Sequence, residues 1–386
     1  MGLFDLFREG AGRDAFAEAL VARLKARDWP HEVVYDPGRF VLKTGDSEVN
    51  LERSFAAWKS YPARERQGRL DTILNPIFEA AQAKDLAFCA PRLLPVIRSR
   101  AQVEAWRLTD GPEMLISAGP APHLVQVVAV DLPSSIMFPN QQSLEDWGET
   151  PAALAARAQA NLEARPQTPF TELEPGLFGS AYGDYQDASR LLVPAIFDAL
   201  PLRGAPVVIP ATPGCVLVAG AEDEAGLAAL RLEATQRFAS SDRPLSHGAI
   251  VRTGGEWRPY TSTEGAEPAF DALWELQRFF EARWTEAAVA AALARGGRTE
   301  AVAPVTMNVF AEAAVGVVSW AEGEPHLLAD LEKVELRPHK GRPFRVRMSD
   351  VEAVCGPLPQ EPDLYPVWRR AVWPTPQQLA ELRARA

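Results

Sequence analysis

The chain has 386 residues, of which 47% are hydrophobic and 24% charged, and its formal net charge is −11. This ordinary globular composition excludes a wholly disordered chain, and the length predicts two or three domains. The acidic excess argues against nucleic-acid binding by the surface as a whole, because phosphate affinity comes from clustered Lys and Arg.

Cysteine usage and hydropathy indicate the compartment. Cys89, Cys215 and Cys355 are odd in number and far apart, so they do not form a disulfide framework and they favour a reducing environment. No apolar run approaches the roughly 20 residues that span a bilayer, and the first residues lack the pattern of a secretory signal. We therefore expect a cytoplasmic protein without a membrane span.

The first predicted module, residues 1–90, contains a helix, a three-stranded meander and further helices. Phe16, Leu20 and Leu24 recur at helical spacing. Turn residues separate the extended segments that follow, which are 31–35, 39–43 and 48–51. Two helices then fit 54–60 and 63–83.

The second predicted module, residues 91–262, alternates strands and helices. The run from Leu124 to Val130 is almost continuously apolar, so we expect a central strand that is buried on both faces. Thr150 followed by Pro151 predicts an N-cap and a helix that extends to about Ala164. The remaining elements are strands at 93–98, 207–209 and 215–219, a helix at 224–238 and a hairpin at 248–260.

The third predicted module, residues 263–386, begins with a long helix. Apolar side chains surround most of that helix between Phe270 and Trp284, which predicts burial on more than one side. Four strands follow, at 305–310, 315–320, 333–336 and 344–348, and Thr375 and Pro376 open a final helix. The predicted fold class is α+β, with mixed, mainly antiparallel sheets flanked by helices in two or three modules.

Four segments of the second module occur in an order and spacing that resemble a known family. They are 95–99 (PVIRS), 182–190 (YGDYQDASR), 207–210 (VVIP) leading into 216–218 (VLV), and the hairpin at 254–259 (GGEWRP). Together they resemble the YtpQ-like family of uncharacterised bacterial proteins, over residues 13–260. The resemblance implies a bacterial cytoplasmic protein, and the family offers no established activity or catalytic residues to transfer. Residues after about 262 lie outside it.

The sharpest polar cluster is Asp184, Tyr185, Asp187 and Arg190. Two carboxylates three residues apart can act as an acid–base pair or bind a cation if burial separates their pKa values. Alternatively, Asp184 caps a helix that starts near Tyr185, and Arg190 pairs with Asp187 in the first turn of that helix. Arg98, on a neighbouring strand, can join the cluster as a charge partner or as an anion ligand.

The cap interpretation also predicts which side chains of this helix are buried. It packs the apolar residues Leu191, Leu192, Ala195 and Ile196 against a sheet. It leaves the polar residues at the start of the helix, Gln186 and Asp187, closer to solvent.

Histidine and cysteine chemistry is sparse. No His or Cys pair has the spacing of a zinc site, so we predict no metal and no cofactor. Cys215 and His247 can form a nucleophile and its base if they meet in space. The apolar residues that follow Cys215 favour a buried, inert thiol instead.

One stretch of the third module concentrates basic residues, namely Lys333, Arg337, Lys340, Arg342, Arg345 and Arg347. Arg345 and Arg347 are expected on the same face of a strand. That face can bind nucleic acid or an acidic protein. Alternatively, it is a solvated surface that Glu332, Glu335 and Asp350 balance.

Three functional hypotheses follow. We prefer a non-enzymatic protein-interaction module, chaperone-like or adaptor-like, with an unidentified protein partner, because no catalytic set is complete. The second is a small-ligand binder or enzyme built around Arg98, Asp184, Asp187 and Arg190. The third is weak nucleic-acid binding by the strand face at 333–347. The oligomeric state is left open.

Overall fold

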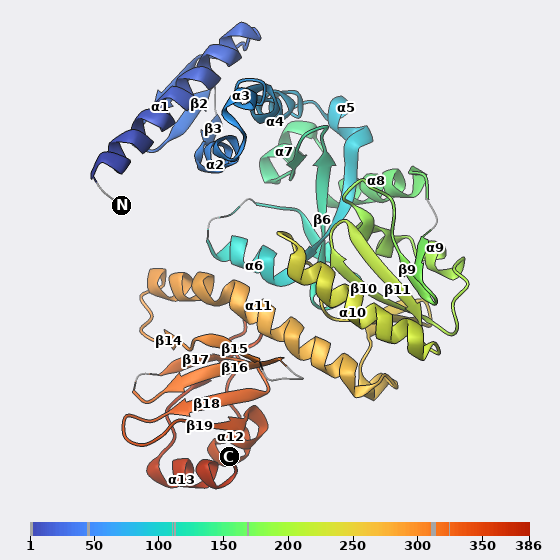
Figure 1. The fold of residues 1–386 in the computed structure, drawn as a ribbon, viewed down its shortest axis with the longest axis vertical. Helices are drawn as coiled ribbons and strands as arrows, with labels where there is room; N and C mark the ends of the chain where they lie inside the picture. The colour runs from blue at the N-terminus through green and yellow to red at the C-terminus, as the bar shows by residue number, and fades with distance from the viewer. Residues whose placement is uncertain are drawn as a thin grey trace. The chain divides into compact units, whose positions relative to one another are not determined.

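The strands of the chain pair mainly as antiparallel neighbours, and helices flank the sheets that they form (Figure 1). The computed structural model describes all residues except 1–2, 45–46, 110, 112, 168–169, 310–313 and 324. The structure is 42% helix and 25% strand, and the strands of the described residues form five sheets. The predicted α+β class is confirmed.

The chain divides into two compact units, the first of which is discontinuous in sequence. The first unit comprises Met1–Arg92 and Val130–Met137, and the second comprises Leu93–Ala129 and Phe138–Ala386. The short segment 130–137 thus belongs to the first unit, although the sequence places it within the second predicted module. That each of the three predicted modules is an independent domain stays a prediction.

The first unit combines a long helix with a three-stranded meander and shorter helices. Its elements are α1 (Leu3–Ala26), β1 (Val33–Asp36), β2 (Val41–Thr44), β3 (Ser47–Asn50), α2 (Glu52–Ser60), α3 (Ala63–Arg66), α4 (Leu70–Gln82), α5 (Leu86–Cys89), η1 (Ala90–Arg92) and β7 (Ile136–Met137). Phe16, Leu20 and Leu24 of α1 are buried together with Leu42 of the meander. The single helix predicted at 63–83 is divided into α3 and α4 by a turn around Gly68, a residue that weakens helix interiors.

The second unit begins with strands of a small sheet. They are β4 (Leu93–Ser99), β5 (Ile116–Ala118) and β6 (Leu124–Asp131), in the order β4, β6, β5, and the neighbouring helices are α6 (Arg100–Leu108), α7 (Gln141–Trp147) and α8 (Pro151–Ala164). Val127, Val128 and Ala129 are all buried, so both faces of β6 are covered, as its apolar sequence predicts. The predicted cap of α8 is also confirmed, because the Thr150 hydroxyl accepts the Ala153 N–H at 3.2 Å.

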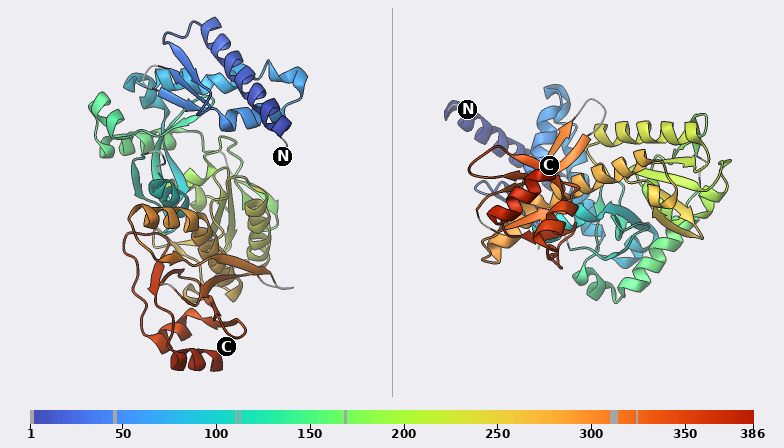
Figure 2. Two further views of the ribbon diagram at one scale, coloured as in Figure 1. Left: turned by 90° about the vertical axis from the view of Figure 1, so that its left-hand side faces the viewer. Right: turned by 90° about the horizontal axis from the view of Figure 1, so that it is seen from below.

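A six-stranded antiparallel sheet positions the candidate site. Its strands are β8 (Thr171–Glu174), β9 (Leu177–Gly179), β10 (Pro206–Thr212), β11 (Cys215–Gly220), β12 (Ile250–Thr253) and β13 (Glu256–Pro259), in the order β13, β12, β10, β11, β9, β8. Alternate side chains pack on opposite faces: Leu217 contacts the side that α10 (Glu224–Ser240) covers, and Val216 and Val218 contact the other. Figure 2 shows α10 along its face of the sheet. The opposite face packs against η2 (Asp187–Leu192) and α9 (Ala195–Asp198).

The remainder of the second unit contains a long helix and two more sheets. After η3 (Ser262–Glu264), its elements are α11 (Pro268–Arg295), β14 (Ala301–Val302), β15 (Val305–Val309), β16 (Ala314–Ala321), β17 (His326–Ala329), β18 (Lys333–Arg337), β19 (Phe344–Arg347), α12 (Met348–Cys355), β20 (Trp368–Ala371) and α13 (Pro376–Ala384). Buried residues of α11 include Phe270, Trp274 and Val289, which belong to three different apolar clusters, so the helix is buried on several sides, as predicted.

One of these predicted strands ends earlier than expected, and the end of another is not tested. Met348 begins α12 and so does not belong to β19, and Phe310 lies outside the described residues. Among the helices that the structure describes, none is both long enough and apolar enough to cross a bilayer.

Candidate functional site

The candidate site lies on the chain segment between β9 and η2, which hydrogen bonds attach to the neighbouring hairpin. Ser180 donates its N–H to the Val216 carbonyl, and its hydroxyl accepts the Val216 N–H, both at 2.9 Å. Further along, Ala188 donates its N–H to the Pro213 carbonyl at 3.0 Å. Residues 181–187, which we call the Tyr185 loop, are therefore fixed at one end to β11 and at the other to the turn between β10 and β11.

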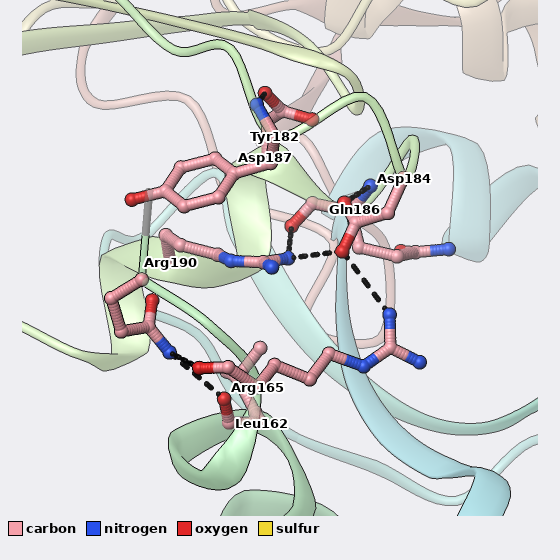
Figure 3. A network of polar contacts seen from close by, with 8 residues as sticks. Leu162, Arg165, Tyr182, Asp184, Gln186, Asp187 and Arg190 are labelled. Atoms are coloured by element: carbon pink, nitrogen blue, oxygen red, sulfur yellow. Dashed lines mark hydrogen bonds and ion pairs between the residues drawn. The ribbon is translucent and has the colours of Figure 1, made fainter. Parts of the chain in front are cut away.

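A buried arginine lies beneath this loop. Arg190 is only 2% exposed, and its Nη1 lies 2.8 Å from Asp184 Oδ2 and 3.2 Å from the carbonyl oxygen of Gln186. Arg165, which follows α8, places its Nη1 3.1 Å from the same carboxylate oxygen. Figure 3 shows the Arg190 side chain stacked on the Tyr182 ring, with 4.2 Å between the guanidinium carbon and the ring centroid. One carboxylate thus compensates two guanidinium groups.

Asp184 stays ionised in this environment. Burial opposes ionisation, but the Gln186 N–H and the guanidinium groups of Arg190 and Arg165 together hold the pKa of Asp184 below its usual value. The Gln186 N–H bond, at 2.9 Å to Asp184 Oδ1, also closes a local turn through the side chain. Asp184 is therefore a fixed negative charge and no proton donor.

Asp187 shifts in the opposite direction. It is 1% exposed, its Oδ1 accepts the Tyr182 N–H at 3.4 Å, and its Oδ2 has no hydrogen-bond partner among the described residues. Burial raises the pKa of Asp187, and a hydrogen bond from the Ser180 side chain offsets only part of this effect. Two neighbouring carboxyls with divergent pKa values are the pattern of an acid–base pair, but protein atoms enclose Asp187 and Arg190.

Tyr185 is the exposed part of the site. Its side chain is 80% exposed, and its backbone has φ of 57°, in the left-handed region. Gly183 has φ of 71°, which costs glycine little, whereas a residue with a side chain loses roughly 1–2 kcal/mol in this conformation. The ring lies beside Gly214 of the hairpin turn, where an added Cβ would lie 3.4 Å from Tyr185 Cδ1.

The predicted helix cap is wrong in three respects. The segment is a 3₁₀ helix that begins at Asp187, because the positive φ of Tyr185 prevents a helix from starting there. Arg190 pairs with Asp184 and not with Asp187, whose carboxylate is bound by the Tyr182 N–H and the Ser180 side chain. Gln186 and Asp187 are buried and not exposed.

The predicted apolar face of this segment is partly correct. Leu191 is buried in the core beneath the six-stranded sheet, and Leu192 and Ile196 pack against it. Ala195 is exposed and belongs to α9, which is a separate turn of helix.

Arg98 does not join the cluster in the described structure. Its Nη1 donates to the neighbouring Ile97 carbonyl at 3.0 Å, and its guanidinium carbon lies 5.9 Å from the centroid of Phe138. Burial, with a smaller contribution from Arg243, lowers the pKa of Arg98 to about 10. Among the described residues, no carboxylate lies within ion-pair distance of Arg98.

Cys215 and His247 are poorly suited to nucleophilic chemistry. Burial raises the pKa of the Cys215 thiol to about 11, so the thiol is protonated near neutral pH. The His247 ring lies 3.7 Å from the Phe238 ring, centroid to centroid, and burial lowers its pKa to about 4. Cys215 therefore supplies no thiolate for nucleophilic attack, as the apolar residues that follow it in the sequence predict.

The basic stretch at 333–347 is largely paired with carboxylates. Glu335 accepts Arg337 Nε at 2.6 Å and Arg345 Nε at 3.0 Å, and these bonds hold its pKa below the usual value against the effect of burial. Lys333 and Arg347 lie opposite each other across β18 and β19, 3.4 and 3.8 Å from Glu332 Oε1. Lys340 and Arg342 lie in the exposed turn between these strands. Pairing of this kind favours a solvated, balanced face.

The cavity that the structure shows most clearly lies away from the buried arginine. This cavity, of about 640 Å³, is open to solvent, and its lining comprises Ala301, Ala321, Glu322, Gly323, Pro325, His326 and His339. The described residues also contain no group of three or more His, Cys, Asp or Glu side chains placed to hold a metal ion.

Sequence reasoning identified part of this network and missed the rest. It named Asp184, Asp187 and Arg190, but Arg165 lies 19 residues before Asp184 and carries no local signal. Tyr182 lies in the same segment as the cluster, yet nothing in its spacing indicates that it stacks on Arg190.

Comparison with protein-family models, curated proteins and solved structures finds no match. The resemblance of residues 13–260 to the YtpQ-like family therefore stays a prediction.

Proposed function

We propose that this protein is a non-enzymatic interaction module that binds a protein partner through the Tyr185 loop. One observation carries the proposal: an aromatic side chain that is 80% exposed is held in a left-handed backbone conformation above a buried ion-pair network. Backbone strain of this kind persists where the surrounding structure enforces it, and it gathers at functional sites.

The chemistry of Tyr185 suits a binding anchor. Tyrosine is enriched among the residues that dominate interface energetics, because it supplies a large rigid surface and a polar hydroxyl. Among the described residues, the other large hydrophobic side chains that are strongly exposed are aliphatic, and the most exposed of them is Val372, at 75%. Because hydrogen bonds at both ends of the Tyr185 loop fix its conformation, binding would require little further ordering.

The ion-pair network supports this role better than it supports catalysis. Arg190 and Asp187 are enclosed, so a substrate cannot reach the groups whose charges would perform acid–base chemistry. Asp187 ends the Tyr185 loop and Arg190 lies beneath it, which makes both of them positioning residues for Tyr185. Burying Arg190 and Asp187 costs free energy, and in return their contacts hold the Tyr185 loop in one conformation.

The test is a substitution that removes the ring but suits the backbone. Asparagine tolerates the left-handed region, so Tyr185→Asn should raise the free energy of unfolding by up to about 1 kcal/mol. In a quantitative pull-down from native lysate with the immobilised full-length chain, partners captured by the wild type should be lost. For a purified partner, Kd should rise about 30-fold, which corresponds to about 2 kcal/mol.

Val372→Asn is the matched control, because it removes an equally exposed apolar side chain elsewhere in the second unit. It should leave the captured partners and their Kd unchanged. If Tyr185→Asn captures the same proteins as the wild type in the same amounts, the proposal is wrong. Because the variant is expected to be more stable than the wild type, misfolding cannot explain a loss of binding.

A further inference from the structure

A glutamate on α11 lies in the interior of the second unit. Glu281 is 4% exposed, and its Oε1 accepts the Tyr365 hydroxyl at 2.8 Å and Gln277 Nε2 at 3.0 Å. Gln277 is itself fully buried, and its Oε1 accepts the His247 N–H at 2.7 Å. These bonds connect α11 to the loop before β12 and to the segment between α12 and β20.

The charged groups around Glu281 leave it without a counter-ion. Arg100 at the start of α6 stacks on the Tyr365 ring, 4.3 Å from its centroid, and Arg278 on α11 pairs with Glu275. Neither lies within ion-pair distance of Glu281 in the described structure. His247 contributes its backbone N–H through Gln277, and its ring packs between Phe238 and Phe280.

The protonation state of Glu281 follows from these contacts. Burial raises the pKa of Glu281 to about 7, and the bonds from Gln277 and Tyr365, with the more distant Arg278 and Arg100, prevent a larger rise. The group is therefore neutral in mildly acidic solution and becomes a buried, uncompensated carboxylate in mildly alkaline solution. An uncompensated buried charge is costly unless water reaches it.

We propose that Glu281 is a proton-dependent latch, which holds the segment around Tyr365 against α11 when neutral and loosens it when ionised. Water can hydrate Oε1 of the ionised carboxylate only if the Tyr365 side chain moves, because the Tyr365 hydroxyl occupies that oxygen. A second attachment, from Arg107 Nη2 to the Asp363 carbonyl oxygen at 3.0 Å, limits how far the segment opens. The latch involves neither the Tyr185 loop nor its partner, so it is independent of the proposed function.

Hydrogen exchange of residues 356–367 tests the latch. In the full-length chain, with rates corrected for the intrinsic effect of pH, the opening equilibrium should rise about tenfold between pH 6 and pH 8. That factor follows from a Glu281 pKa of about 7 when the segment around Tyr365 is closed and about 4.5 when it is open. In Glu281→Gln the side-chain oxygen still accepts the hydrogen bonds from Gln277 and Tyr365, but the side chain cannot ionise. Protection of residues 356–367 in this variant should therefore be the same at both pH values.

Two further variants complete the experiment. Glu275→Gln removes a carboxylate from the same helix and should retain the tenfold change. Tyr365→Phe removes one of the two donors and should lower protection already at pH 6. A wild type whose corrected protection does not change with pH would overturn the proposal, and so would a Glu281→Gln variant that keeps the tenfold change.

Discussion

Arg190 is buried to an extent that is rare for arginine, and its charge depends on a single carboxylate. Removing a guanidinium from water costs several kcal/mol, and a well-placed partner recovers part of that cost. Asp184 supplies that partner, while Arg190 Nε remains buried without a hydrogen bond in the described structure. Tyr182 Oη and Ser189 Oγ, both in the same segment, are also buried without partners. The segment therefore has little tolerance for further loss of polar contacts.

Asp184→Ala should destabilise the protein by about 3 kcal/mol, since it leaves Arg190 buried and uncompensated. A helix cap alone would account for only about 1 kcal/mol. Urea unfolding monitored by circular dichroism measures the difference. Asp184→Asn, which keeps the acceptor for the Gln186 N–H, should lose nearly as much because the charge is gone. A loss near 1 kcal/mol for the alanine variant would mean that Arg190 gains access to water.

At the residue scale, the sequence predicted the members of the cluster better than their pairing. Spacing predicts an Asp187–Arg190 pair, because those residues would face each other on a helix. The left-handed backbone at Tyr185 redirects the chain, so Asp184 reaches Arg190 instead. A positive φ at a non-glycine residue is set by the surrounding contacts, and no local pattern announces it.

At the scale of elements, local chemistry made the predictions reliable. The caps at Thr150 and Thr375 were predicted from the residue pairs that begin α8 and α13, and both hydroxyls accept the expected backbone N–H. Such caps involve residues within one turn, so sequence alone specifies them. The 3₁₀ helix η2 depends on contacts with β4, β11 and α8, which are distant in sequence. This is why its start and type were predicted wrongly.

Thr150→Ala should lower the free energy of unfolding by about 1 kcal/mol, because the Ala153 N–H loses its side-chain acceptor. Thr150→Ser keeps the hydroxyl and should lose only a few tenths of a kcal/mol. Chemical denaturation of the two variants in parallel measures both values. Equal losses would show that the Thr150 methyl group, and not the cap, stabilises α8.

For the whole molecule, buried ionisable groups make stability depend on pH in opposing ways. Burial lowers the pKa of His123 to about 3 and that of His247 to about 4. Their contribution to the free energy of unfolding is complete above a pH of about 6.5, the pKa of histidine in the unfolded chain, and is lost as pH falls. Burial raises the pKa of Glu281 to about 7, so its contribution is complete below about 4.5 and is lost as pH rises. Asp187 acts in the same direction as Glu281.

Between pH 6.5 and 4.5, the two histidines should each remove about 2 kcal/mol of stability, and Glu281 should restore about 2 kcal/mol. Because the other titrating groups are common to both proteins, Glu281→Gln should lose about 2 kcal/mol more than the wild type over this pH range. Denaturation curves at pH 4.5, 5.5 and 6.5 measure both slopes. Parallel slopes for the two proteins would show that Glu281 titrates with an ordinary pKa.

The first unit depends on residues that are synthesised late. Glu79 of α4 is buried, and its carboxylate accepts the Ser134 hydroxyl at 2.7 Å, the Ser135 hydroxyl at 2.8 Å and the Ser134 N–H at 3.2 Å. On a ribosome, residues 1–92 emerge before 93–137, a stretch of about 45 residues that takes roughly 2–9 s to translate. During that interval the Glu79 carboxylate lacks its serine partners and must stay hydrated. The first unit is complete only after residues 130–137 have been synthesised.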